Sequence, residues 1–461
     1  MNSEILGISI YVLAMLIMGF YVSKRIKTND DYFLGGRTLG PFLTTFSIFA
    51  TWFGAETCIG TAGAVYREGL SSIHADPLGY AACILLMGVF FAKVLWKKKI
   101  TTIPDLFRER FSPATEKLAA ILLVPSSIIW AGAQIRAFGQ IIHSTTDYGF
   151  TIAVTVAAVV VIIYTVSGGM LADAYTDLIQ GFALIAGLAF LLIAMIWDMG
   201  GIEKSFATID VSRLNVFGGH EDRSFLGRLE LWMVPIMGSL MAQELVSRVL
   251  ASRSETIAAN SCYRAGGMYL LVGFIPVLVG LLGLHYMPNL HDTETIMPLL
   301  AKTHLSYFFY IIFVGALVSA ILSTVDSTLL SASALFSHNL IYPSLNNLTE
   351  RKKVLIARGG VLVSGFIAYG IAFTSDSITE LVELASGLGG PSILVMTLVA
   401  LYVKRGHAVH AIFAICMSIV TWGVCHFVFE MEFPVLMTVV MCMLSYFVSS
   451  FFGDKRVYAE S

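Results

Sequence analysis

The residues best suited to chemistry lie in one apolar stretch, residues 315–330. Four of them are spaced so that they share one face of a helix: Ala320, Ser323, Thr324 and Ser327. Three hydroxyl groups therefore line that face, and Asp326 lies on the neighbouring row. Clustered hard oxygen ligands suit a small alkali cation, whereas a soft metal prefers other ligands. The stretch therefore indicates a cation site.

The alternative is that these hydroxyls only let helices pack closely, as Ser and Thr often do in membranes. This interpretation leaves Asp326 unexplained, because a carboxylate at membrane depth costs several kcal/mol unless it meets a partner, water or an ion. We therefore favour the cation site.

The composition places this site in a membrane. The chain has 461 residues, of which 57% are hydrophobic and 13% charged, and its mean hydropathy is +0.79. Apolar runs long enough to cross a bilayer recur along it. These runs predict an all-α integral membrane protein of about thirteen spans: 4–22, 41–66, 75–96, 116–143, 150–168, 174–197, 228–247, 257–286, 306–337, 356–374, 378–403, 407–428 and 432–452.

Charge and cysteine usage exclude several other classes of protein. The net charge of −2 argues against binding to nucleic acid. The six cysteines lie in apolar segments and form no C-x-x-C pair, and the ten histidines show no ligand spacing, so we expect neither a disulfide framework nor a zinc site. Segment 4–22 lacks a basic start and a cleavage site, so we expect it to remain as a span.

Lys and Arg residues predict the topology, because cytoplasmic connections are rich in them. They concentrate in alternate connections, at 24–37, 97–110, 248–253, 351–353, 404–405 and 455–456. Connections 144–149 and 374–378 carry none. We therefore expect a multi-pass protein of the cell (plasma or inner) membrane, with its N-terminus outside and its C-terminus in the cytoplasm. Segment 102–111 is too charged to span and should lie along the inner surface, and 198–227 should be an outside loop.

Two of the predicted spans contain residues that interrupt a helix. Residues 51–63 of the first include three glycines, several hydroxyls and Glu56. Span 228–247 has Pro235 and Gly238 before its polar end. Such a break frees backbone carbonyls to bind a cation, and it is tolerated where the chain lines a cavity. Gly and Pro are common in membrane helices, so these residues alone do not decide whether the helices are broken.

The distance between the two breaks predicts a symmetric architecture. Five spans separate them, which fits two inverted five-helix repeats. We expect the repeats at about 41–197 and 228–403, in a single membrane transport domain, 1–461. Three predicted spans would be peripheral to the repeats: 4–22, 407–428 and 432–452.

Four ordered motifs resemble the sodium:solute symporter family: residues 33–37 (Phe-Leu-Gly-Gly-Arg), 60–66, 167–180 and 320–330. The similarity runs from Phe33 to about residue 405. It implies the inverted-repeat fold of the leucine transporter, usually with thirteen spans, and sodium as the coupling ion. By position, the family's main sodium site would consist of backbone carbonyls and two hydroxyls, those of Ala50, Phe53, Ala320, Ser323 and Thr324.

The resemblance also implies a second sodium site in some relatives. Its positions here are Asp177, Asp326 and Ser327. Asp326 replaces a hydroxyl that several members have, which adds charge. Asp177 could instead be an acid on the exit path of a single sodium ion, so both interpretations stay open.

Within this family, the sequence motifs at residues 50–54, 78–80 and 247–250 most resemble those of choline transporters. Trp52, Tyr80 and Trp130 match their aromatic box, whereas Ala242 stands where a fourth aromatic residue is expected. Choline is a quaternary ammonium, which aromatic faces attract. A lone tryptophan is more often an interfacial anchor, but Trp52 and Trp130 lie in the middle of their spans.

Four polar residues can orient a solute: Glu56, Gln134, Gln243 and Glu244. One acid would balance an organic cation. Arg136 is expected to pair with an acid such as Glu56, or to receive a substrate carboxylate, which keeps amino acids and small carboxylates as candidates.

The sequence thus predicts a sodium-coupled secondary active symporter that imports a small organic solute, with an organic cation such as choline favoured. The alternatives are sodium-coupled uptake of a proline-like amino acid or a small monocarboxylate, or, in a different class, a passive channel or a membrane sensor. A membrane enzyme would need a metal cluster or a nucleophile–base pair, and the sequence offers neither. The expected partners are the solute and the lipid bilayer, with no obligatory protein partner.

Overall fold

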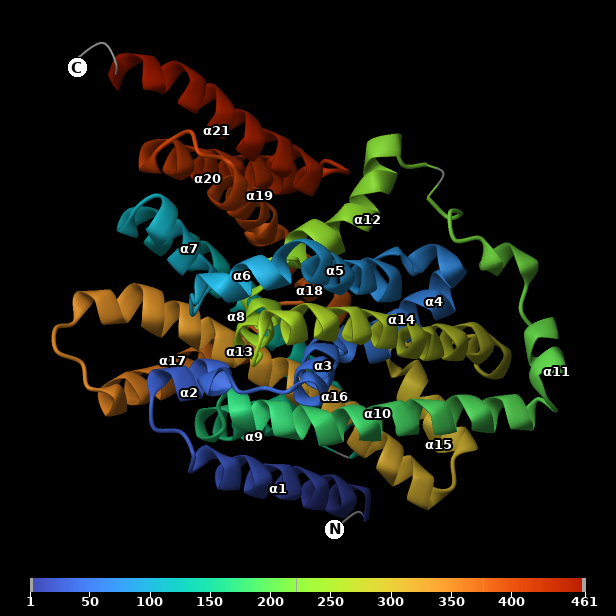
Figure 1. Cartoon of the computed structure of the whole chain (residues 1–461). Helices are drawn as coiled ribbons and strands as arrows, with labels where there is room; N and C mark the ends of the chain where they lie inside the picture. The colour runs from blue at the N-terminus through green and yellow to red at the C-terminus, as the bar shows by residue number, and fades with distance from the viewer. Residues whose placement is uncertain (1–2, 147, 221, 376, 458–461) are drawn as a thin grey trace.

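The computed structural model describes residues 3–146, 148–220, 222–375 and 377–457, and its long elements are α-helices (Figure 1). Helices satisfy every backbone polar group internally, as a bilayer requires. Within the described residues, ten helical segments are long and apolar enough to cross a membrane. They comprise α5 (Tyr80–Leu86) with α6 (Ala92–Lys98), α8 (Pro113–Thr145), α9 (Phe150–Ser167), α10 (Met170–Asp198), α14 (Glu255–Tyr286), α16 (Tyr307–Ala334), α17 (Glu350–Ile371), α18 (Ile378–Leu388) with α19 (Gly390–Tyr402), α20 (Ala408–Gly423) and α21 (Pro434–Val457).

Both predicted helix breaks are confirmed. Helix α3 (Pro41–Trp52) meets the following segment, Glu56–Ser72, at 57°. Helix α12 (Phe225–Ser239) meets α13 (Gln243–Ala251) at 48°. Counting each bent pair as one span gives up to twelve spans among the described residues. The predicted total of thirteen, which includes α1 (Ser3–Ser23), stays a prediction.

The order of the helices supports the predicted repeats. Four spans separate the first bent pair from the second, and the second is followed by four spans and then by α20 and α21, which were predicted to be peripheral. In the first series the short helix α7 (Ile103–Arg110) connects the second and third spans, and in the other series α15 (Ile296–His304) has the same place. The boundaries of the repeats stay a prediction.

The connections gather at two opposite ends of the bundle, as the charge pattern predicts. Hydrogen bonds join connections that are rich in Lys and Arg: Arg37 to the carbonyl of Ile100, Arg110 to that of Lys404, and the N–H of Asn29 to Glu350. Others join the opposite connections: Arg213 to the carbonyl of Tyr66, Gln140 to Asp292, and Ser224 to Glu432. Which end faces the cytoplasm stays a prediction.

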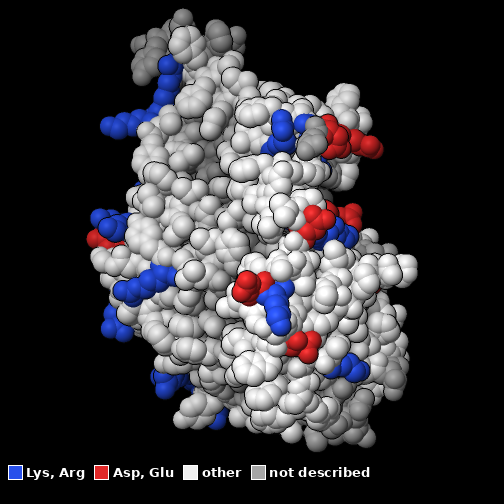
Figure 2. All heavy atoms as spheres, turned by 90° about the vertical axis from the view of Figure 1, so that its right-hand side faces the viewer, with Lys and Arg blue, Asp and Glu red and all other residues white. Residues whose placement is uncertain are grey.

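Figure 2 looks at the end of the bundle where α11 (Ile202–Ala207) and α15 lie on the right of Figure 1. Most of the surface in this view is uncharged, and Lys, Arg, Asp and Glu occur in small groups. The connection 198–227, predicted to be an outside loop, contains the short helix α11 and a 3-10 turn, Val211–Leu214.

Segment 102–111, predicted to lie along the inner surface, contains the short helix α7, which is held at its start by Asp105. Thr102 and Asp105 make a capping box, and Asp105 also accepts a hydrogen bond from Asn339, 2.9 Å away. Burial raises the pKa of Asp105, but hydrogen bonds from His338 and from the helix start outweigh this effect, so the pKa lies below its ordinary value. The carboxylate thus joins α7 to the end of the α16 span.

Helix α16 lies at the centre of the fold, next to α3 and α10 (Figure 1). Every residue of α16 from Phe313 to Ala334 is buried, and so is every residue of α3 from Thr44 to Trp52. The hydroxyl face of α16 is therefore turned into the protein on all sides and not toward lipid.

Candidate functional site

The hydroxyl face of α16 meets a carboxylate of α10. Ser323 donates a hydrogen bond to Oδ1 of Asp177, and Ser47 of α3 donates to Oδ2 at 2.6 Å. All three side chains are buried. Asp177 therefore links the first broken helix to the hydroxyl helix.

Thr324 lies between the two sets of predicted sodium ligands. Its hydroxyl is 3.1 Å from the carbonyl oxygen of Ala320 and 3.5 Å from that of Ala50. Phe53 follows at the break, where its backbone leaves the helical region (φ −88°, ψ 66°). Thr324 thus brings Ala50 and Ala320 together, with Ser323 beside it on α16 and Phe53 one turn beyond Ala50.

The residues predicted for a second sodium are not in mutual contact. Ser327 bonds to Thr51 at 3.1 Å and to Asp173 at 3.3 Å, and not to Asp177. Asp326 is 1% exposed, and neither of its carboxylate oxygens accepts a hydrogen bond from any described residue.

A buried ion pair, which the sequence analysis missed, lies beside Ser327. Arg248 of α13 pairs with Asp173 of α10, and the same guanidinium donates to Ser327. Both partners of the ion pair are fully buried. The available signal was the spacing of Asp173, one helical turn before Asp177. Any sodium ion at Ser327 would have to share that hydroxyl with the guanidinium.

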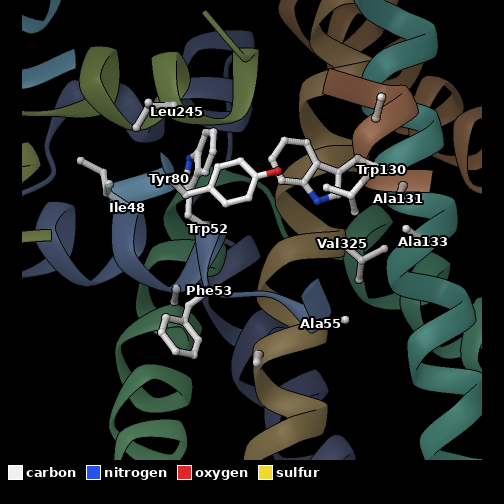
Figure 3. Packing of buried hydrophobic residues seen from close by; sticks show 14 of the residues in the cluster. Ile48, Trp52, Phe53, Ala55, Tyr80, Trp130, Ala131, Ala133, Leu245 and Val325 are labelled. Carbon is white, nitrogen blue, oxygen red and sulfur yellow. The ribbon is translucent and has the colours of Figure 1, made fainter. Parts of the chain in front are cut away.

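The three predicted aromatic residues form one cluster. The ring centroids of Trp52 and Tyr80 are 5.4 Å apart, those of Trp52 and Trp130 5.3 Å, and those of Tyr80 and Trp130 6.4 Å. Figure 3 shows Tyr80 beside Trp52, with its hydroxyl pointing toward Trp130. All three rings are at most 5% exposed. Ala242, at the expected fourth position, lies at the second helix break and precedes α13.

A polar pair lies one turn from Trp130 on α8. Gln134 donates to Oε2 of Glu56 at 2.7 Å, and its own Oε1 accepts from the N–H of Ala55 at 3.0 Å. Oε1 of Glu56 is buried and has no hydrogen-bond partner among the described residues. A carboxylate oxygen is therefore left available beside the aromatic cluster.

Arg136 does not pair with Glu56 in the described structure, and its pairing with another acid stays a prediction. Arg136 donates to the carbonyl of Ala372 and lies 4.9 Å from the ring centroid of Phe150. Arg136 follows Trp130 by six positions, which is more than one turn of α8. At this spacing the two side chains do not share a helix face, so Arg136 points away from the aromatic cluster.

The two polar residues of α13 face different neighbours. Gln243 accepts from the N–H of Ile103 at 3.0 Å, so it holds the start of α7. Glu244 accepts from Ser127 of α8 at 2.6 Å, three residues before Trp130. Glu244 thus lies nearer to the aromatic cluster along α8, whereas Gln243 is used to position α7.

A second group of polar residues, which the sequence analysis also missed, surrounds Asp76. Thr57 is 2.6 Å from Oδ2 of Asp76, and the hydroxyl of Tyr269 is 3.0 Å from the same atom. The signal that could have found it is a carboxylate inside the predicted span 75–96. Among the described residues, no cluster of three or more His, Cys, Asp or Glu side chains that could hold a metal is found.

Gly54 is the point at which residues predicted for the sodium site and residues predicted for the solute site approach each other. A Cβ atom there would lie 2.7 Å from Oε2 of Glu56, 2.7 Å from Oγ1 of Thr324 and 3.0 Å from Oε1 of Gln134. Carboxylate, hydroxyl and amide oxygens from three elements therefore converge on the break. A residue with a side chain would displace at least one of them.

With this geometry described, comparison with known proteins identifies the class. The family model for the sodium:solute symporter family matches residues 32–418, and the chain belongs to this family. The human high affinity choline transporter 1 is 27% identical over 424 residues, which cover 87% of this chain and 73% of that protein. The osmoregulated proline transporter OpuE of Bacillus subtilis is 28% identical, with 87% and 84% covered. These relatives are transporters, which supports the prediction that the chain is not an enzyme.

Solved structures show the same fold. A Na+-coupled sialic acid symporter in a substrate-bound, outward-open state superimposes with a TM-score of 0.86 at 19% identity, covering 97% of both chains. The nucleobase-cation-symport-1 family transporter Mhp1 has a TM-score of 0.60 at 14% identity, covering 89% of this chain and 93% of its own. The fold is therefore the leucine-transporter type, built around two broken helices.

The convergence at Gly54 leads to a test of the site. Gly54→Ala should raise the sodium concentration needed for half-maximal thermal stabilisation of the purified protein about tenfold, because overpacking costs about 1–3 kcal/mol. Gly267→Ala, on α14, is the matched control, because a Cβ there meets nothing within 4 Å. An unchanged sodium response in Gly54→Ala would show that the converging oxygens do not form the ion site.

Proposed function

We propose that this symporter imports a small organic cation, such as choline, together with sodium. The observation that carries the proposal is the contact of the three rings with one another beside a buried carboxylate that keeps one oxygen available. Each ring can attract an ammonium group by about 0.5–2 kcal/mol, depending on desolvation. Glu56 supplies the compensating negative charge. Ala242 leaves one wall without a ring, so the pocket suits a bulkier cation or binds choline less tightly than a complete box.

The sodium ion would bind on the other side of the same helix break. We assign it to the carbonyls of Ala50, Phe53 and Ala320 and to the hydroxyls of Ser323 and Thr324. The contacts of Thr324 with Ala50 and Ala320 support this assignment. Trp52 lies in the chain between Ala50 and Phe53, whose carbonyls we assign to sodium. The ion and the solute would therefore act on the same backbone segment.

A second sodium between Asp177, Asp326 and Ser327 requires a further step. Arg248 would have to release Ser327, to which it donates a hydrogen bond in this conformation. We therefore propose that one sodium binds with the inner ion pair closed, and that a second binds only when Arg248 has moved.

The second candidate is uptake of a zwitterion or a small carboxylate. The indole N–H group of Trp52 is buried and has no hydrogen-bond partner among the described residues. Such a donor suits a carboxylate, and proline transporters are among the relatives. For either solute we propose a plasma or inner membrane location, with the N-terminus outside and the C-terminus in the cytoplasm.

The sodium assignment can be tested by removing one ligand at a time. Ser323→Ala and Thr324→Ala should each raise the sodium concentration for half-maximal uptake into proteoliposomes about five- to thirtyfold, which corresponds to about 1–2 kcal/mol for one lost polar contact. Thr328→Ala, which removes a buried hydroxyl bonded only to Val325 of its own helix, is the control and should behave like the parent. Normal sodium activation in both site variants would exclude this site.

The solute assignment can be tested at Trp52. Trp52→Ala should abolish high-affinity uptake of radiolabelled choline, whereas Trp52→Phe should retain part of it, because a smaller aromatic face still attracts a cation. Competition by unlabelled choline, betaine, proline and lactate should show choline and betaine as inhibitors. Sodium-dependent uptake of radiolabelled proline or lactate that choline and betaine do not inhibit would establish the second candidate instead.

A further inference from the structure

Asp76, Thr57 and Tyr269 form a closed ring of three oxygen atoms, which we call the Asp76 ring. They come from three elements: the turn His74–Gly79, the turn Glu56–Gly60 and helix α14. Thr57 is 2.6 Å from Asp76 and 2.6 Å from Tyr269, and Tyr269 is 3.0 Å from Asp76. Asp76 is 7% exposed, and the other two are fully buried.

The number of hydrogen atoms in the ring fixes its protonation. All three oxygen–oxygen distances are hydrogen-bond distances, and each such contact needs one hydrogen atom between its two oxygens. The hydroxyls of Thr57 and Tyr269 supply one each, and an ionised carboxylate supplies none. The third hydrogen is present only when the carboxyl group of Asp76 is protonated. With Asp76 ionised, one of the three contacts would bring two lone pairs together.

The surrounding charges also favour the neutral carboxyl group. No described Lys, Arg or His forms an ion pair with Asp76, and the charged group acting on it is Glu56, next to Thr57 in the chain. His74, on the same turn, bonds instead to the carbonyl of Ser71. An ionised carboxylate without a partner is costly at this depth.

Among the described residues, the neighbouring elements bring no compensating charge to the ring. Helix α14 contributes the hydroxyl of Tyr269, and α5 begins with Tyr80, a member of the aromatic cluster. On α12, Glu230 is bound to backbone N–H groups of α21, and Arg228 lines an open cavity of about 360 Å³ together with His74.

We propose that Asp76 is a proton-binding site of this symporter, separate from its sodium and solute sites. In this conformation the carboxyl group holds a proton and ties the segment after the first helix break to α14. Loss of that proton to water leaves a carboxylate that two hydroxyls can still bond, but the third contact is lost and the ring opens. Since Thr57 follows Glu56, the protonation of Asp76 affects the position of the solute-binding acid.

Infrared difference spectroscopy of the reconstituted protein, titrated from about pH 5 to about pH 9, tests this proposal without a solute. The parent should show the carbonyl band of a protonated buried carboxyl group, lost at high pH. Asp76→Asn should lack that band, and Glu56→Gln should retain it. Asp76→Asn is expected to fold, because its amide N–H supplies the third hydrogen. A band that persists unchanged in Asp76→Asn would overturn the proposal.

A second variant covers the case in which Asp76→Asn fails to fold. Tyr269→Phe removes one hydroxyl from the ring, so the carbonyl band of Asp76 should shift in frequency, whereas Tyr263→Phe on the same helix should leave it in place. Tyr263 bonds to the carbonyl of Gly88 and not to the ring. A band that does not move in Tyr269→Phe would show that the ring does not hold the proton.

Discussion

The break of the first broken helix, between Trp52 and Ala55, is the constraint on which the rest of the structure depends. A helix interrupted at membrane depth exposes backbone groups that lipid cannot satisfy, so protein groups or ligands must do so. The amide oxygen of Gln134 accepts from the N–H of Ala55, and the hydroxyl of Thr324 approaches the carbonyl of Ala50. Helices α8 and α16 are therefore held against the break, because their side chains bond to the backbone groups that the break leaves unpaired.

This arrangement supports our proposal that two ligands of different chemistry are linked at the break. Trp52 belongs to the aromatic cluster, and Ala50 and Phe53, which precede and follow it in the chain, provide two of the carbonyls assigned to sodium. Gly54 leaves just enough room for Glu56, Gln134 and Thr324 to meet around the break. An ion that fixes the backbone there also fixes the ring and the acid that face the solute. The coupling is then a property of one short segment, and no long pathway through the protein is required.

Local patterns in the sequence were sufficient for much of this description. The hydroxyl face of α16 follows from helical spacing, the two breaks follow from Gly and Pro inside apolar runs, and the aromatic residues follow from a family motif. Contacts between distant segments could not be predicted in this way. Arg248 and Asp173 are separated by 75 residues, and Asp76 and Tyr269 by 193. Neither their spacing nor their type indicates the partner, and for the same reason the sequence did not show that Arg136 has no contact with Glu56.

The central claim is that sodium and the organic cation act on the same helix break. It is tested most directly by measuring sodium affinity with and without saturating choline, and choline affinity with and without saturating sodium, by calorimetry on the purified protein. Because linkage is reciprocal, the account predicts that each ligand tightens the other by the same factor, about 5- to 150-fold. Choline and sodium affinities that are independent of each other would contradict it.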